Sequence, residues 1–299
     1  LKTVSMDLGG TFTLNADLDL SGENWAPLGT NSDPFTGTFD GNGHVIKNLT
    51  YNSSEADKIG LFGVAHGATI KNLGLENVNI YAHNDVAGLL GFEKWNCTIS
   101  GCYVTGKISG RDHVGALLGG GDAVEGKVTN ITDSYAVAYV YSRDSQAGGL
   151  VGITKDVTID RCYFAGHVYD NNNCIGGILS LVDGGYTVIK NSFVAAPYVV
   201  SPNAWHGKGR ILGLANDHTT LENNYALADM KVGKFGEFAT ANSNTAGNDG
   251  ASKTYDELTS PDFIKNILGW DTEKVWVAAD GVLPHLAWQK AAIDASAVY

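Results

Sequence analysis

Short apolar runs, bounded by Gly, Asn and Asp, return along the middle of the chain at a nearly constant spacing. The phrase Gly60-Leu61-Phe62-Gly63 recurs in related form, with starts at positions 60, 88, 116, 149, 177 and 210. Successive starts lie 28 or 33 residues apart, and a period of about 20–50 residues is typical of solenoids, propellers and arrays. We interpret the two wider intervals as the same unit with five extra residues in a loop.

A second phrase follows each Gly-Leu unit: a β-branched residue or leucine and, four positions later, an aromatic ring. The copies are Ile99/Tyr103, Ile131/Tyr135, Ile159/Tyr163, Ile189/Phe193 and Leu221/Tyr225. We expect these rings to stack in a column that packs coil against coil.

Each unit also has room for a third short strand, in segments such as 77–81 and 167–169. Three short strands and three turns in about 28 residues are the unit of a right-handed parallel β-helix, whose coils stack at about 4.8 Å. The sequence therefore predicts an all-β chain, a parallel β-helix (solenoid) of about six to eight coils.

The two ends of the chain depart from the repeat. Residues 1–58 are predicted to form an N-terminal coil and cap, so that the β-helix covers residues 1–235. Residues 236–299 are predicted to be a linker and a C-terminal capping segment, with small polar residues over 236–252. A Ser-Pro start and a Gly stop indicate a short helix over 260–269.

The capping segment also holds three tryptophans, at positions 270, 276 and 288. We expect the segment to lie over the last coil, with these tryptophans in its core.

The net charge of -12 and the pI near 5.0 argue against nucleic acid or an anionic membrane surface as the main partner. No stretch approaches the roughly 20 apolar residues that span a bilayer. The four cysteines lack Cys-x-x-Cys spacing. Cys102 and Cys162 share a repeat position two coils apart, too far for a disulfide. We expect them to fill the coil interior.

A polar corner precedes each Gly-Leu unit. The copies are His83-Asn84-Asp85, Arg111-Asp112-His113, Arg143-Asp144-Ser145-Gln146 and Asn171-Asn172-Asn173. Stacked corners would form a ridge. Turn chemistry explains these residues, because Asn and Asp tolerate left-handed backbone and bond their own main chain. The alternative is a glycan-binding or catalytic ridge.

For that alternative, the candidate ligand-binding residues on the ridge are Arg111, Asp112, His113, Arg143 and Asp144. Trp95 and Trp205 lie in loops outside the repeat phrase and could stack on sugar rings. A loop tryptophan that folds back over its own coil is the competing interpretation.

No His-Glu-x-x-His, Gly-x-Ser-x-Gly, phosphate-loop or Cys-x-x-Cys motif occurs. We therefore predict no catalytic residue, no metal site and no cofactor. Asp112 and Asp144 are the best carboxylate pair for a polysaccharide lyase or glycoside hydrolase. Their positions in the aligned corners differ by one residue, so they are not equivalent in the repeat.

The Gly-Leu repeats, the lead-in Trp25-Ala26-Pro27-Leu28-Gly29 and the stretch 35–49 together resemble the GLUG-repeat proteins of bacterial surfaces. Similar repeats occur in the N-terminal region of bacterial immunoglobulin A peptidases and in adhesin-like proteins. The resemblance covers about residues 11–230. It implies surface exposure and attachment, and it supplies no agreed catalytic residues.

These observations lead to one functional prediction and two alternatives. The chain is predicted to be a non-enzymatic, secreted or cell-surface, adhesin-like bacterial protein. It would bind host or dietary glycans or proteins, as a monomer, without nucleic-acid binding or membrane insertion. The alternatives are a polysaccharide lyase or hydrolase on the same scaffold, and a structural spacer in a larger surface protein.

Overall fold

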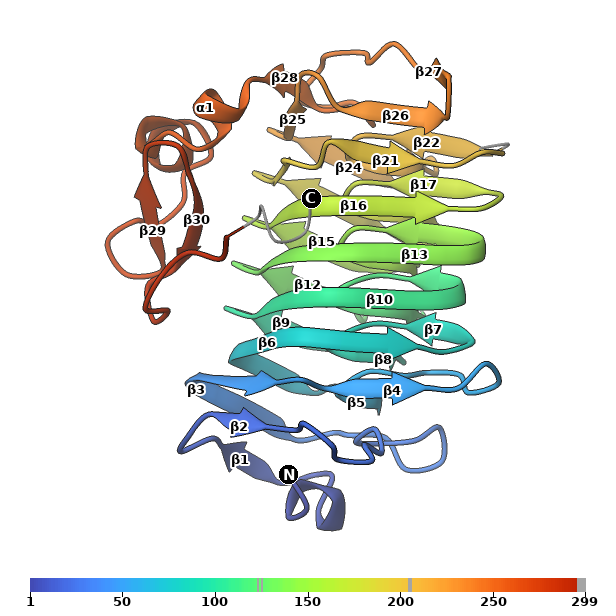
Figure 1. Cartoon of the computed structure of the whole chain (residues 1–299), viewed down its shortest axis with the longest axis vertical. Coiled ribbons are helices and arrows are strands. Elements are labelled where there is room, and N and C mark those ends of the chain that lie inside the picture. Colours follow the sequence, from blue (N-terminus) through green and yellow to red (C-terminus); the bar gives the residue numbers. More distant parts are fainter. Residues whose placement is uncertain (123, 125, 204–205, 295–299) are drawn as a thin grey trace.

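The computed structural model describes residues 1–122, 124, 126–203 and 206–294. It is a parallel β-solenoid of about eight turns (Figure 1), which confirms the predicted fold class. Each coil runs through a short strand, a long strand that ends at a corner, and a Gly-Leu strand that returns to the start.

The Gly-Leu phrases form one wall, a separate sheet of parallel strands. Its members are β5 (Phe62–Ala65), β8 (Leu90–Glu93), β11 (Leu118–Gly121), β14 (Val151–Thr154), β18 (Leu179–Val182) and β23 (Leu212–Leu214).

The other walls form one large sheet. Its short strands, which precede the repeated ring, are β9 (Thr98–Ser100), β12 (Thr129–Thr132), β15 (Val157–Asp160), β19 (Thr187–Lys190) and β24 (Thr219–Glu222), and β1 (Thr11–Thr13) pairs with the start of the first long strand. Its long strands are β3 (Thr38–Lys47), β6 (Thr69–Tyr81), β10 (Tyr103–Val114), β13 (Tyr135–Gly148) and β16 (Tyr163–Asp170).

Shorter strands complete the large sheet at the corners and in the first and last coils. They are β2 (Leu18–Asp19), β4 (Thr50–Asn52), β7 (Asn84–Val86), β17 (Cys174–Gly176), β20 (Phe193–Val194), β21 (Tyr198–Val200), β22 (Gly207–Gly209), β25 (Tyr225–Leu227), β26 (Lys231–Lys234), β27 (Glu237–Phe238) and β28 (Ala251–Lys253). A 3-10 helix, η1 (Val4–Met6), opens the chain.

The predicted register is confirmed. The residues of the second phrase pair coil to coil, Ile131 with Ile99 and Ile159, and Tyr135 with Tyr103 and Tyr163. The isoleucines are buried in the main hydrophobic core. The segments 77–81 and 167–169 are indeed strand, at the ends of β6 and β16.

The expectation that each wide interval holds one five-residue loop is wrong. In the first wide interval, residues that pair between neighbouring coils are 28 positions apart in the sequence at Phe92 and Gly120. The separation is 32 positions at Thr98 and Asn130, and 33 at Asp112 and Ser145. The insertion is thus divided between the loop after β11 and the corner of β13. A turn can accept an extra residue because its backbone need not pair with the next coil.

The five repeated rings form a column on the outside of the coils. Tyr103, Tyr135, Tyr163 and Phe193 stack with centroids 4.6–5.1 Å apart and planes within 8°. These rings are buried, and they belong to a second hydrophobic cluster, apart from the coil interior. We call them, with Tyr225, the buried ring column.

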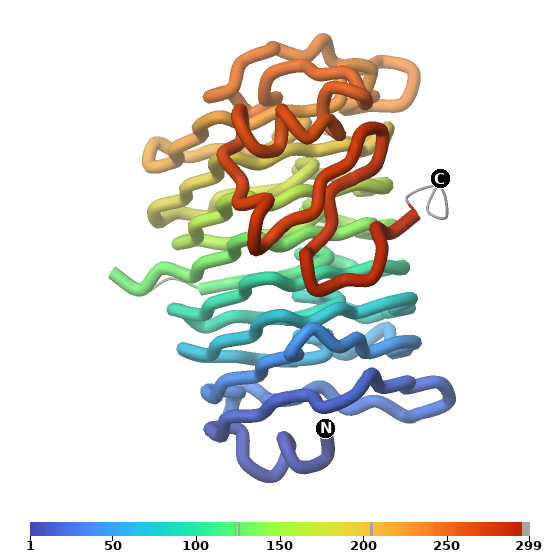
Figure 2. Tube along the Cα trace, turned by 90° about the vertical axis from the view of Figure 1, so that its left-hand side faces the viewer, coloured from blue at the N-terminus to red at the C-terminus, as the bar shows by residue number. Residues whose placement is uncertain are grey.

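The segment that buries this column is residues 254–294, which we call the flank segment. It contains α1 (Tyr255–Leu258), the π-helix η2 (Phe263–Ile267) and the hairpin of β29 (Trp276–Ala279) with β30 (Val282–Leu286). Figure 2 shows it, in orange to red, lying across the stacked coils.

The expected position over the last coil is therefore corrected. Trp270 Nε1 donates to the Asn191 carbonyl (2.8 Å), and the Tyr163 hydroxyl donates to the Pro284 carbonyl (2.8 Å). The flank segment runs back along the coils because the ring column offers it a continuous apolar surface. Trp270 and Trp276 are buried there, as expected of core residues, whereas Trp288 is half-buried and packs against the edge of this cluster.

The helices also differ in position from the one predicted over 260–269. The π-helix η2 occupies 263–267 inside the predicted range, and α1 begins earlier, at a capping box formed by Thr254 and Glu257.

The polar stretch 236–252 closes the last coil. The amides of Ile211 and Leu212 donate to the Asn248 carbonyl (2.9 and 3.0 Å). Arg210, fully buried, donates to the carbonyls of Asp249 (2.9 Å) and Gly250 (2.8 Å). These bonds cover the end of the solenoid, where strand edges would otherwise be exposed.

All four cysteines are buried and free, and Cys102 and Cys162 lie inside the coils as expected. None of the helices in the described part of the chain is both long and apolar enough to cross a membrane.

Candidate functional site

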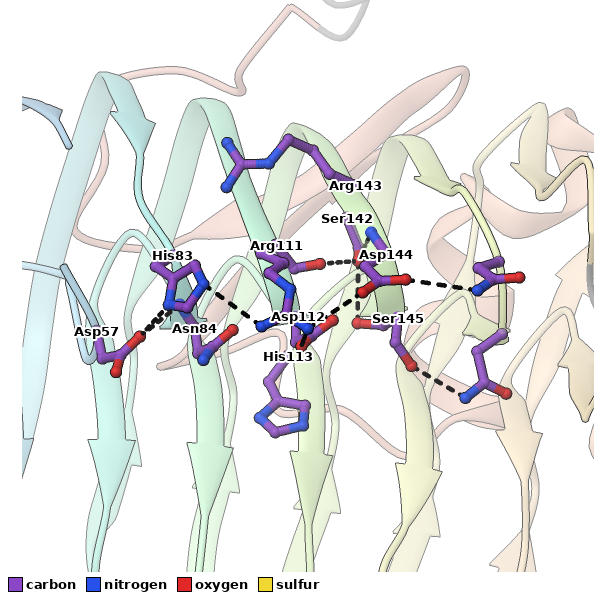
Figure 3. A network of polar contacts seen from close by, with 12 residues as sticks. Asp57, His83, Asn84, Arg111, Asp112, His113, Ser142, Arg143, Asp144 and Ser145 are labelled. Carbon is purple, nitrogen blue, oxygen red and sulfur yellow. Dashed lines mark hydrogen bonds and ion pairs between the residues drawn. The ribbon is translucent and has the colours of Figure 1, made fainter. Parts of the chain in front are cut away.

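The polar corners stack into one ridge, as the sequence predicts (Figure 3). We define this corner ridge as residues 83–85, 111–113, 143–146 and 171–173. It lies where the long strands end and the chain turns into the Gly-Leu phrase. Asp85, His113 and Gln146 take left-handed φ values of 55–61°, which makes the sharp corner that Asp, Asn and His tolerate best.

A chain of polar contacts crosses the ridge from coil to coil. His83 Nδ1 lies 2.8 Å from Asp57 Oδ1, and its Nε2 lies 3.4 Å from a terminal nitrogen of Arg111. The other terminal nitrogen of Arg111 is 3.3 Å from Asp144 Oδ2. Asn172 Nδ2 in turn donates to Asp144 Oδ1 (3.4 Å). These contacts order the corners as a ladder of turns, but Asn84 Oδ1, Asp112 Oδ1 and one terminal nitrogen of Arg143 are buried without a hydrogen-bond partner among the described residues.

Asp112 and Asp144, the best carboxylate pair in the sequence, share one cation. The same Arg111 nitrogen lies 3.7 Å from Asp112 Oδ2 and 3.3 Å from Asp144 Oδ2. Burial raises the pKa of Asp112, and Asp144 adds to this, whereas Arg111 opposes it. The net effect of these surroundings is a raised pKa for Asp112, which is the direction that a general acid in glycoside hydrolysis needs.

His113 does not join this network. Its Nδ1 lies 2.7 Å from Asp85 Oδ1, and Figure 3 shows its ring turned away from Arg111. Asp85 packs against Gly120 of β11, where an added Cβ would come within 2.4 Å of the carboxylate. The His113–Asp85 pair thus lies against the Gly-Leu wall.

Arg143 leaves the ridge. One terminal nitrogen donates to the Ala82 carbonyl (2.9 Å), and the guanidinium lies 4.2 Å from the centre of the Tyr81 ring. This cation–π contact places Arg143 on the outer face of the long strands.

That outer face carries exposed aromatic rings that the sequence analysis missed. Alternate residues of β6, β13, β16 and β21 point outward, and neighbouring coils place rings in register. Tyr81 and Tyr139 are 38% exposed and Tyr198 is 40% exposed. We define the exposed aromatic face as Tyr81, Tyr139, Tyr141, His167, Tyr169 and Tyr198.

The rings of this face contact one another. His167 stacks on Tyr198 at 5.5 Å, Tyr139 lies 6.2 Å from His167, and Tyr141 lies 5.2 Å from Tyr169. The signal that could have revealed the face is the pair of rings two residues apart in two successive units, Tyr139/Tyr141 and His167/Tyr169.

Trp95 lies on the loop after β8, at a different corner of the coil from the ridge. Its half-buried ring packs edge-on against His66 at 4.4 Å, and its carbonyl accepts from the Gly67 amide (3.0 Å). The structure therefore does not bring Trp95 and the corner ridge together. Trp205 lies outside the described residues.

A cleft of about 630 Å³ opens between the end of the flank segment and the first coils. Its carboxylates are paired: Asp17 lies 3.0 Å from His44, and Glu76 lies 3.2 Å from Lys47 and accepts from the Tyr103 hydroxyl (2.6 Å). Within the described residues, no three His, Cys, Asp or Glu side chains are grouped so that they could hold a metal ion.

Comparison with known proteins gives no matching family model. The chain is 34% identical over 122 residues to halomucin of Haloquadratum walsbyi, covering 37% of this chain and 1% of halomucin. It is 29% identical over 205 residues to an immunoglobulin A1 protease of Streptococcus pneumoniae, covering 61% of this chain and 10% of the protease. The chain thus spans about a tenth of that protease.

A crystal structure of a Bacteroides ovatus protein named after the immunoglobulin A1 proteases superimposes with a TM-score of 0.78. It has 25% sequence identity and covers 94% of this chain and 86% of that protein. This whole-length similarity agrees with the repeat phrases and with the observed register. The chain is therefore a parallel β-solenoid whose repeats resemble the GLUG type, and it is similar to part of the immunoglobulin A1 proteases.

Proposed function

We propose that this chain is a non-enzymatic, secreted or cell-surface repeat protein that binds a glycan on the exposed aromatic face. The observation that carries the proposal is the continuous row of Tyr139, His167 and Tyr198, in register on successive coils and partly open to solvent. Flat rings beside polar groups suit a sugar, which presents an apolar face and a rim of hydroxyls.

The corner ridge borders this face and belongs to the proposed site. Arg143 reaches Tyr81 from the ridge, and Asp144 and Arg111 remain 44% and 46% exposed. These groups can bond sugar hydroxyls at the edge of the rings.

The non-enzymatic part of the proposal rests on Arg111. Arg111 contacts both Asp112 and Asp144, so a guanidinium occupies the space that a glycosidic oxygen or a water would need between two catalytic carboxyls. The similarity to immunoglobulin A1 proteases covers about a tenth of their length, so their activity is not transferred to this chain in the proposal.

The test is affinity electrophoresis in native gels cast with a panel of polysaccharides and stained for both protein and glycan. We expect retardation in at least one gel with the glycan intact. Replacing two rings, Tyr139→Ala with Tyr198→Ala, should weaken the retardation at least about tenfold, because each ring contributes about 1 kcal/mol of stacking.

Tyr186→Ala is the matched control, because Tyr186 is 64% exposed and lies just before β19, away from this face. A cleared zone in the glycan stain would contradict the non-enzymatic assignment and direct attention to Asp112 and Asp144. Equal retardation of the double variant and the control would remove the aromatic face from the proposal. No retardation in any gel would leave a spacer role.

A further inference from the structure

We infer, on the basis of the proposed function, that the ligand is an acidic polysaccharide whose chain lies along the axis of the solenoid, across successive coils. The inference combines the charge of the exposed aromatic face with the order of its residues from coil to coil.

The rings of the central row lie between two lysines, and beyond Lys107 the row continues with Asn79 and Thr50. Coil by coil, the Cα partners in this row are Lys107, Tyr139, His167, Tyr198 and Lys231. Coils stack at about 4.8 Å, so the two lysines stand about 19 Å apart along the axis. This is the length of a few sugar units, too long for a single monosaccharide.

The second row lies two residues further along each strand. Its members are Tyr81, Ser109, Tyr141, Tyr169 and Val200, and Arg143 covers Tyr81. None of the residues named in these two rows is an Asp or a Glu.

This charge pattern contrasts with the rest of the molecule. The chain as a whole carries a net charge of -12, yet the charged groups on the face are Lys107, Arg143 and Lys231. An acidic ligand would be repelled by most of the surface and attracted here, which gives both position and selectivity.

Three acidic groups near the border of the face are paired or buried, whereas Asp229, just before Lys231, and Asp256, beside Tyr255, are exposed. Asp144 lies against Arg111 (3.3 Å), Glu237 lies against Lys234 (3.3 Å), and Asp170 is fully buried. They therefore oppose an acidic ligand less than free carboxylates would.

Two open hollows adjoin the face and can take the substituents of a sugar chain. One, of about 410 Å³, lies beside His167, Tyr198 and Tyr255. The other, of about 330 Å³, lies beside Asn52, Asn79 and Tyr81. Each hollow shares rings with the face, His167 and Tyr198 in the first and Tyr81 in the second. The rows themselves run from coil to coil, so we expect the ligand chain to follow the solenoid axis.

The experiment compares polygalacturonate and hyaluronan with their carboxyl-reduced forms, which keep the same backbones without the charges. We expect the acid forms to bind at least about tenfold more tightly than the reduced forms, and added sodium chloride to weaken only the acid forms. Among galacturonate oligomers, affinity should rise with length until the two lysines are bridged and then level off.

The protein variants separate charge from stacking. Lys107→Glu with Lys231→Glu should weaken binding of the acid form at least about tenfold. Lys127→Glu is the control, because Lys127 is exposed and precedes β12, away from the face. Circular dichroism and thermal unfolding verify that each variant is folded.

The outcomes distinguish failure of the acidic-ligand inference from failure of the proposed function. The acidic ligand is wrong if the reduced forms bind as well as the acid forms. It is also wrong if the lysine reversals change nothing while Tyr139→Ala with Tyr198→Ala still weakens binding. In both cases the proposed function stands. If the tyrosine variants also bind like wild type, or no polysaccharide binds, both are overturned.

Discussion

Glu93 is a fully buried carboxyl group at the end of β8. Its Oε2 accepts from the Thr129 hydroxyl (2.8 Å), while its Oε1 has no partner among the described residues. Burial raises its pKa from 4.5 to about 8, and Asp122 and Asp156 add to the shift, against the Thr129 bond. Glu93 is therefore mostly protonated in the folded chain at neutral pH.

This gives a pH-dependent prediction for Glu93→Gln. Because the folded state holds the proton more tightly, the stabilisation from Glu93 is complete below about pH 4.5 and is lost as the pH rises toward 8. Glutamine stays neutral throughout. The free energy of unfolding of Glu93→Gln, minus that of wild type, should therefore grow by roughly 3 kcal/mol between pH 4.5 and pH 7.

Urea unfolding at several pH values measures this difference. Exposed Glu23 provides the control variant, Glu23→Gln. A difference between Glu93→Gln and wild type that stays flat with pH would show that Glu93 is ionised in the folded chain.

Among single residues, those that repeat from coil to coil could be predicted from the sequence, and those that vary could not. The ring four positions after Ile99 or Ile131 was found because the same kind of residue returns in each unit. The exposed row from Lys107 to Lys231 changes chemical type at almost every coil, so it leaves no periodic signal even though the register aligns it. Solvent-facing positions are free to vary in this way, because no packing constraint fixes them.

At the scale of elements, the flank segment and the buried ring column form a joint core. Trp276 is fully buried between them: its Nε1 donates to Asp133 Oδ1 (3.2 Å), and its ring lies 6.1 Å from both Tyr135 and Tyr163. It also lies 4.4 Å from Trp270. The contacts of Trp276 with Asp133, Tyr135 and Tyr163 join residues more than 100 positions apart and occur once, so the repeat pattern could predict the column but not what covers it.

Trp276→Ala should release the flank segment before the solenoid unfolds. A large buried aromatic replaced by alanine costs about 3–5 kcal/mol, and the loss falls on the docking of residues 254–294. Limited proteolysis should therefore cut within this range much faster than in wild type, while the solenoid remains as a resistant fragment.

The neighbouring Val277, which is 41% exposed, gives the control Val277→Ala. Equal cleavage rates for the two variants would mean that Trp276 does not hold the flank segment in place.

At the scale of the whole molecule, the solenoid presents two different sides. The flank segment covers the starts of the long strands, and the corner ridge occupies their ends, with the exposed aromatic face between them (Figure 1). The fold and the stacked ridge could be predicted because they follow from the repeat. The polar stretch 236–252 was predicted as a linker, and its role in closing the last coil depends on backbone bonds such as Leu212 to Asn248, which carry no side-chain signature.

The measurement that tests the central claim most directly is hydroxyl-radical footprinting, read by mass spectrometry, with and without the polysaccharide that retards the protein in affinity gels. Tyr139 and Tyr198 are predicted to lose reactivity when the glycan binds, together with Tyr81. Tyr186 and Trp95, on other parts of the coil, should keep theirs. Protection of Trp95 or of Tyr186, with Tyr139 and Tyr198 unchanged, would contradict the assignment of the exposed aromatic face as the binding surface.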